Sequence, residues 1–207
     1  ELPLVMIDVQ RGGPSTGLPT KTEQGDLLQV LYGRNGESPM PVIAPTSPVN
    51  CFDAAYMACK IAMEHMTPVV VLSDAYIANG SGAWPIPEVK DLPSITPHRV
   101  TEEMKDKYTP YMRDEKTMAR YWAVPGQEGY AHIIGGLEKD SATGQISNDP
   151  DNHHQMVRNR AEKVARIPVP DLHVSGDVDG AELLIVGFGG TYGHLYTAME
   201  ELLEQGK

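Results

Sequence analysis

Cysteine is scarce in this chain of 207 residues, which contains only Cys51 and Cys59. Two thiols are too few for a disulfide scaffold, or for an iron–sulfur cluster held by four thiolates of this chain. No apolar run approaches the roughly 20 residues of a membrane-spanning helix, and no signal peptide is apparent. We therefore expect a soluble protein of a reducing compartment, the cytoplasm, that does not enter a membrane.

Basic residues are also in short supply. Lys and Arg number 17 against 28 Asp and Glu, which gives a formal net charge of −11. An acidic surface argues against broad binding to nucleic acid or to anionic membranes, because both need basic patches. The 20 glycines and 17 prolines indicate that much of the chain is loop. The length suits one or two domains.

Apolar runs alternate with a helical pattern in the first third of the chain. Residues 4–9, in which Asp8 is the one polar residue, and residues 69–72 are aliphatic runs, typical of strands that are buried on both faces of a parallel sheet. Between them, apolar residues recur at helical spacing over 50–66, and Thr67-Pro68 ends that helix. Strand, helix and strand in this order predict an α/β fold with parallel pairing, to which residues 42–44 could add a short strand.

The remaining segments are less regular. Residues 26–32 suit a short helix that ends at Gly33, and prolines break up 74–129 into an extended connection. Charges spaced at three and four predict a surface helix over 151–167. Residues 183–205 have the pattern of one strand, one glycine turn and one helix. A lone unit of this kind cannot bury its own faces, so we expect the chain to be a piece of a longer polypeptide.

The segment 10–24 is the most informative for function. It follows the first predicted strand, where α/β proteins place ligands, and it combines Arg11 with glycines and hydroxyl side chains. A guanidinium is matched to a carboxylate or phosphate, and glycines let the backbone approach a ligand closely. Local pattern alone leaves two interpretations open, an anion-binding loop and a polar surface loop with a solvated Arg.

Two other clusters suggest sites but fit them poorly. A dinucleotide fingerprint in 187–193 would need a glycine where Tyr192 stands, so a tight strand-to-helix turn is the simpler interpretation. Asp149, Asp151, His153 and His154 do not have the spacing of a calcium-binding loop, and adjacent histidines point to different helix faces. We predict no metal site here, and Asp149 and Asp151 suit the start of a helix.

Residues 9–24 also resemble a known signature. Their sequence, Val-Gln-Arg-Gly-Gly-Pro-Ser-Thr-Gly-Leu-Pro-Thr-Lys-Thr-Glu-Gln, is similar to that of the α subunit of 2-oxoacid:ferredoxin oxidoreductases of the 2-oxoglutarate type. The resemblance extends over most of the chain, through 26–28, 32–34, 36–37, 50–52, 71–74, 136–138 and 149–153, with Met156 and Arg160.

The resemblance implies a domain plan, with a parallel-sheet thiamine-diphosphate-binding fold of the pyrimidine-domain type. Residues 1–80 would be the C-terminal half of the pyrimidine-binding domain, 81–180 an extended linker and helix, and 181–207 the start of a transketolase C-terminal-like α/β domain. By motif, Arg11 matches an Arg that binds the substrate carboxylate, and Ser15, Thr16 and Thr20 would line that pocket. The family's second carboxylate ligand, a Thr of a Pro-Ile-Thr-Pro motif, has no counterpart here.

The implied reaction is oxidative decarboxylation of a 2-oxoacid such as 2-oxoglutarate, with coenzyme A accepting the acyl group and ferredoxin the electrons. Thiamine diphosphate and Mg²⁺ would be held mainly by a β subunit, and the iron–sulfur cluster by a partner subunit. The Glu that contacts the cofactor's aminopyrimidine is absent from this sequence, so we expect no catalytic residue and no cofactor bound by this chain alone. The alternative is a non-catalytic module that binds a small anion or a partner chain through residues 12–17.

Overall fold

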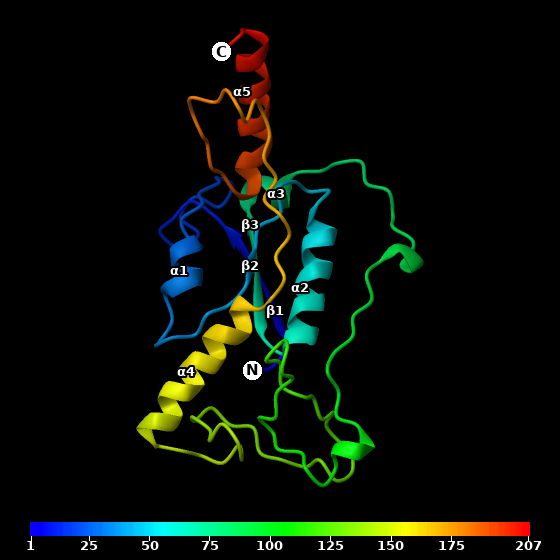
Figure 1. The fold of residues 1–207 in the computed structure, drawn as a ribbon. Coiled ribbons are helices and arrows are strands. Elements are labelled where there is room, and N and C mark those ends of the chain that lie inside the picture. Colours follow the sequence, from blue (N-terminus) through cyan, green and yellow to red (C-terminus); the bar gives the residue numbers. More distant parts are fainter.

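A computed structural model describes all of residues 1–207 and confirms the α/β class. Its sheet has three parallel strands in the order β1-β3-β2, with bounds β1 Leu4–Gln10, β2 Val42–Ile43 and β3 Pro68–Asp74. The strand β3 is central, and its register with β1 runs from Leu4 opposite Pro68 to Gln10 opposite Asp74. The carboxyl ends of β1 and β3 therefore lie side by side at one edge of the sheet (Figure 1).

Five α-helices accompany the sheet. Their bounds are α1 Leu27–Tyr32, α2 Cys51–His65, α3 Ala75–Asn79, α4 Pro150–Ala165 and α5 Tyr192–Glu204. In Figure 1, α1 and α2 lie on opposite sides of the sheet, and α5 extends beyond the carboxyl end of β3. Four of these helices were predicted, and only α3 was not. None of the helices is both long and apolar enough to cross a membrane.

The core lies between α2 and the two long strands. Ala54, Ala58 and Ala62 form the buried face of α2 and pack against Val69 and Val71 of β3. Small side chains on the helix let it approach the sheet closely, and the β-branched valines fill the space between them. The helix ends at Met66, whose left-handed backbone turns the chain directly into β3. The predicted helix–strand pair thus forms the centre of the structure.

The prediction that β1 is buried on both faces is wrong for this chain. Leu4 is 51% exposed, Met6 41% and Ile7 64%, whereas residues 69–72 of β3 are buried. The physical reason is the strand order, because β1 pairs with β3 along one edge and has no strand along the other. An aliphatic run identifies a strand here, but its burial depends on neighbours that the run itself does not specify.

The predicted strand over 183–186 does not form. The segment has no regular structure, and Leu184 and Val186 are 80% and 85% exposed. The backbone N–H and C=O groups of a strand need a neighbouring strand to pair with, and this segment pairs with none of the three strands of the sheet. The turn and helix predicted after it do form, as the 3-10 turn η3 (Gly189–Thr191) and α5.

The long connection between α3 and α4 is extended, as its prolines predict. It contains two single 3-10 turns, η1 Val89–Asp91 and η2 Glu102–Met104, and a small core around Val100, Ala123 and Tyr130. The helix α4 then begins at Pro150, and the side chain of the preceding residue, Asp149, accepts a hydrogen bond from the Asn152 N–H at 2.8 Å. This is the helix-start role that the sequence predicted for Asp149.

Candidate functional site

The candidate site lies in the loop that follows β1. Hydrogen bonds close this loop on itself: the Gly12 N–H donates to the Lys21 carbonyl at 2.9 Å, and the Leu18 N–H donates to the Gly12 carbonyl at 3.1 Å. Gly17 permits a tight turn within it, since an added Cβ would stand 3.0 Å from the Pro14 carbonyl oxygen. The loop is therefore a compact structure with a defined shape rather than an open excursion of the chain.

A carboxylate within the loop adds to this closure, and Gln10 attaches the loop to the sheet. The Glu23 side chain accepts a hydrogen bond from the Gly13 N–H at 2.8 Å. Below it, the buried Gln10 side chain donates to the Ser73 carbonyl at 3.1 Å and accepts from the Asp26 N–H at the same distance. These contacts connect the ends of β1 and β3 to the start of α1, so the loop rises from a rigid base.

The loop forms one wall of a cavity of about 760 Å³. Arg11, Ser15 and Thr16 line this cavity together, whereas Thr20 lies in the same loop but outside the lining. The Arg11 side chain is exposed and takes part in none of the chain's ion pairs. Its guanidinium is therefore available to an anionic ligand.

Three carboxylates share the cavity with Arg11. They come from Asp8 on β1, Glu23 in the loop and Asp26 before α1. Burial raises the pKa of Asp8, and the neighbouring charge of Asp26 raises that pKa further. The sequence does not predict these acids as site residues, because only the closed loop brings residues 8, 23 and 26 together.

Asp74 at the end of β3 links the site to the C-terminal part of the chain. This buried carboxylate accepts hydrogen bonds from the Ile77 N–H and the Gly190 N–H, both at 3.0 Å, and from the Gln24 side-chain amide at 3.5 Å. The Gln24 amide also donates to the Phe188 carbonyl at 3.0 Å. One side chain thus caps α3 and holds the turn η3 against the end of the sheet.

The close approach at Asp74 explains the second glycine cluster. A Cβ on Gly190 would lie 2.5 Å from the Asp74 Oδ2, and Gly189 has a φ of +63°. The turn predicted at 187–193 therefore forms, and in addition it docks on a carboxylate 116 residues earlier. Nothing local in the sequence marks this contact, although Asp74 directly after a buried strand is the kind of position at which such anchors occur.

Comparisons with known proteins show which proteins this chain is similar to. Residues 1–151 match the family model described as pyruvate flavodoxin/ferredoxin oxidoreductase, thiamine diphosphate-binding. The chain is 52% identical to the 2-oxoglutarate oxidoreductase subunit KorA of Mycobacterium tuberculosis, covering 100% of this chain and 31% of that protein. It is 28% identical to the 2-oxoglutarate synthase subunit KorA of Methanothermobacter marburgensis, covering 100% of this chain and 54% of that protein.

A solved structure shares the fold. The 2-oxoglutarate:ferredoxin oxidoreductase from Magnetococcus marinus, with 2-oxoglutarate, coenzyme A and succinyl-CoA bound, superposes with a TM-score of 0.84 at 33% identity. The match covers 99% of this chain and 35% of that one. The chain thus spans between about a third and about half of the length of these relatives. Since the family model covers well over half of its residues, the chain belongs to the thiamine diphosphate-binding family of pyruvate flavodoxin/ferredoxin oxidoreductases.

Proposed function

We propose that this chain is part of the α subunit of a 2-oxoacid:ferredoxin oxidoreductase, and that its Arg11 binds the carboxylate of the 2-oxoacid. The observation that carries the proposal is the free guanidinium of Arg11 in a cavity at the carboxyl end of β1. The family and the names of the relatives support the reaction class. Oxidative decarboxylation of 2-oxoglutarate to the acyl-CoA is the reaction that these names favour.

The loop chemistry suits a 2-oxoacid. A guanidinium can bind both oxygens of a carboxylate, which fixes the orientation of the acid as well as its position. The hydroxyls of Ser15 and Thr16 line the same cavity and can donate to the substrate's oxygens. Thr20 lies in the same loop but does not line the cavity, and it would offer the substrate a further hydroxyl group. Because the loop is closed on itself, these groups are held in place before the substrate binds.

The residues of this cavity do not fit the diphosphate of thiamine diphosphate. The lining offers one guanidinium against three carboxylates, so a diphosphate would meet a net negative charge. We assign the diphosphate and Mg²⁺ to the β subunit, and the iron–sulfur cluster that passes electrons to ferredoxin to a partner subunit. The present chain then contributes to substrate binding within a cytoplasmic complex, in which coenzyme A accepts the acyl group.

The domain plan remains part of this proposal. The whole sheet lies within residues 1–80, which suits the later half of a pyrimidine-binding domain. Residues 81–180 contain the extended connection and α4, and 181–207 contain η3 and α5. We take the last segment as the start of the transketolase C-terminal-like domain, anchored to the first domain through Asp74.

The test is substitution of Arg11 in the complete α/β enzyme. Arg11→Ala should reduce kcat/KM for the 2-oxoacid about 100-fold, which corresponds to about 3 kcal/mol for a pair of charged hydrogen bonds. Arg11→Lys keeps the charge but loses the fork geometry and should recover only part of this. The matched control is Arg158→Ala, which removes an exposed Arg of α4 that forms no ion pair. Unchanged kinetics in Arg11→Ala would refute the assignment.

A further inference from the structure

The loop that carries Arg11 returns to the sheet through a second leg, residues 21–24, which runs beside its first residues. The Gly12 N–H donates to the Lys21 carbonyl of this leg at 2.9 Å, and the Gly13 N–H donates to a carboxylate of the same leg at 2.8 Å. Both bonds start within two residues of Arg11. A shift of the second leg therefore moves the backbone next to the guanidinium that is proposed to bind the substrate.

The last residue of the second leg, Gln24, is attached to the C-terminal part of the chain. Its side-chain amide donates to the Phe188 carbonyl at 3.0 Å and to the Asp74 carboxylate at 3.5 Å. The amide nitrogen lies 2.9 Å from the point that a Cβ on Gly189 would occupy, so only the glycine leaves room for it. The bond to Phe188 is the one hydrogen bond that joins the loop to residues beyond 180.

The two acceptors that hold Gln24 are fixed independently of it. Asp74 is 1% exposed and also accepts hydrogen bonds from two backbone N–H groups, both at 3.0 Å. The Phe188 carbonyl also accepts from the Thr191 hydroxyl at 2.7 Å. Each acceptor keeps a partner when Gln24 is replaced, so no buried polar atom is left without a hydrogen bond. A variant at Gln24 should therefore fold and lose only the attachment of the loop to η3.

We propose that Gln24 is a positioning residue, whose hydrogen bonds to Phe188 and Asp74 hold the second leg so that Arg11 is placed for the substrate carboxylate. This inference rests on the proposed function, because Gln24 does not line the cavity and would act only through Arg11. A guanidinium binds both oxygens of a carboxylate only within narrow geometric limits, and a small displacement lowers the rate. The turn η3 thus becomes part of the support of the binding loop.

The experiment uses Gln24 variants of the complete α/β enzyme. Gln24→Met keeps the length of the side chain but cannot donate a hydrogen bond. Gln24→Glu keeps the shape but brings a second carboxylate to Asp74, where the amide nitrogen now lies at 3.5 Å. Gln145→Met is the matched control, because the Gln145 side chain is exposed and makes no hydrogen bond.

Two quantities are measured on these variants. The first is hydrogen exchange of the loop amides that donate within the loop, those of Gly12, Gly17, Leu18 and Lys21. The second is kcat/KM for 2-oxoglutarate, with Arg11 present and in the Arg11→Ala background. A general loss of structure would lower kcat/KM in both backgrounds, whereas an effect through Arg11 disappears when Arg11 is absent.

The expected result is exchange of the loop amides that is about fivefold faster in Gln24→Met, faster still in Gln24→Glu and unchanged in Gln145→Met. With Arg11 present, Gln24→Met should lower kcat/KM about fivefold, and in the Arg11→Ala background it should lower it no further.

Three outcomes would overturn the inference. They are wild-type exchange of the loop amides in Gln24→Met, an equal fall in kcat/KM with and without Arg11, and an unchanged kcat/KM in Gln24→Met when Arg11→Ala lowers it. Faster exchange with kinetics that neither Gln24→Met nor Arg11→Ala alters would instead contradict the proposed function and support the attachment of the loop to η3.

Discussion

Gly190 is the position at which one added methyl group should weaken the attachment of the C-terminal segment to the sheet. In Gly190→Ala the new Cβ would stand 2.5 Å from the Asp74 Oδ2 and 3.0 Å from its Oδ1. The carboxylate cannot move away easily, because it is buried and also caps α3 through the Ile77 N–H. The turn must therefore withdraw by roughly 0.9 Å to reach ordinary contact distance.

The magnitude follows from the hydrogen bond that this withdrawal breaks. The Gly190 N–H donates to Asp74 at 3.0 Å, and a retreat of this size takes it out of hydrogen-bond range. A hydrogen bond to a charged group contributes about 1.5–3 kcal/mol, and the entropy that alanine removes from the unfolded chain offsets about 0.4–1 kcal/mol. The net cost is about 1–2 kcal/mol, which corresponds to local opening that is about 5- to 30-fold more frequent.

Amide hydrogen exchange measures this opening directly. The amides of 188–195 should exchange about 5- to 30-fold faster in Gly190→Ala, while amides within β3 keep their protection. Gly193→Ala is the matched control, because a Cβ there meets nothing within 4 Å and alanine suits the helix α5. Unchanged exchange in Gly190→Ala, or equal acceleration in both variants, would refute the anchoring role of Asp74.

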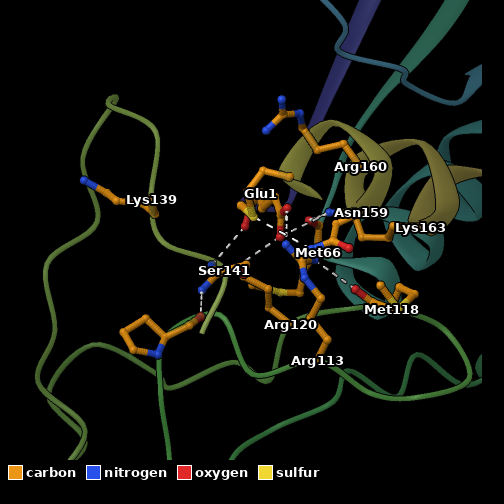
Figure 2. Close-up of polar contacts among 12 residues, drawn as sticks. Glu1, Met66, Arg113, Met118, Arg120, Lys139, Ser141, Asn159, Arg160 and Lys163 are labelled. Atoms are coloured by element: carbon orange, nitrogen blue, oxygen red, sulfur yellow. Dashed lines mark hydrogen bonds and ion pairs between the residues drawn. The ribbon is translucent and has the colours of Figure 1, made fainter. Parts of the chain in front are cut away.

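Two further substitutions test the electrostatics and the helix start. Burial alone would raise the pKa of Glu1, but Lys163 and Arg113, which form ion pairs with its carboxylate (Figure 2), lower that pKa from 4.5 to about 2. The ionised Glu1 side chain therefore stabilises the fold by about 3 kcal/mol above pH 4.5, and this contribution is lost as the pH falls toward 2. Glu1→Gln should therefore flatten the pH dependence of urea unfolding between pH 4.5 and 2; an unchanged slope would contradict these ion pairs. Asp149→Ala removes the cap on the Asn152 N–H and should cost about 1 kcal/mol, a fall in Tm of about 2–4 °C. Arg158→Ala is its control, and an equal fall there would contradict the capping role.

The elements that the sequence predicts well are those whose signal is local. The helix α2 follows from apolar residues at helical spacing and from Thr67-Pro68, and β3 follows from an aliphatic run that is buried in the sheet. The same kind of run over 183–186 fails, because a strand also needs a partner and the run cannot specify one. The exposure of β1 has the same cause, since its free edge depends on strand order alone.

The candidate site likewise has residues with a local sequence signal and contacts between distant residues that have none. The glycine-rich loop after a strand and the resemblance together predict Arg11, Ser15, Thr16 and Thr20 as one binding pocket. The first three line one cavity, and Thr20 does not. The contact between Asp74 and Gly190 spans 116 residues, and that between Glu1 and Arg113 spans 112. Contacts of this range depend on the assembled fold and leave no periodicity or spacing in the sequence.

The two ends of β1 carry opposite electrostatic arrangements, and this bears on what each can bind. At the carboxyl end, one exposed guanidinium faces three carboxylates, which suits a ligand with a single carboxylate at Arg11 and disfavours a diphosphate. At the amino end, the buried side chains of Arg113, Arg120 and Lys163 all form ion pairs with the Glu1 carboxylate. A dicarboxylate such as 2-oxoglutarate would therefore have one carboxylate at Arg11 and would need a second cation from residues outside this lining. Kinetics of Arg11→Ala with 2-oxoacids that lack the distal carboxylate would separate the two contributions.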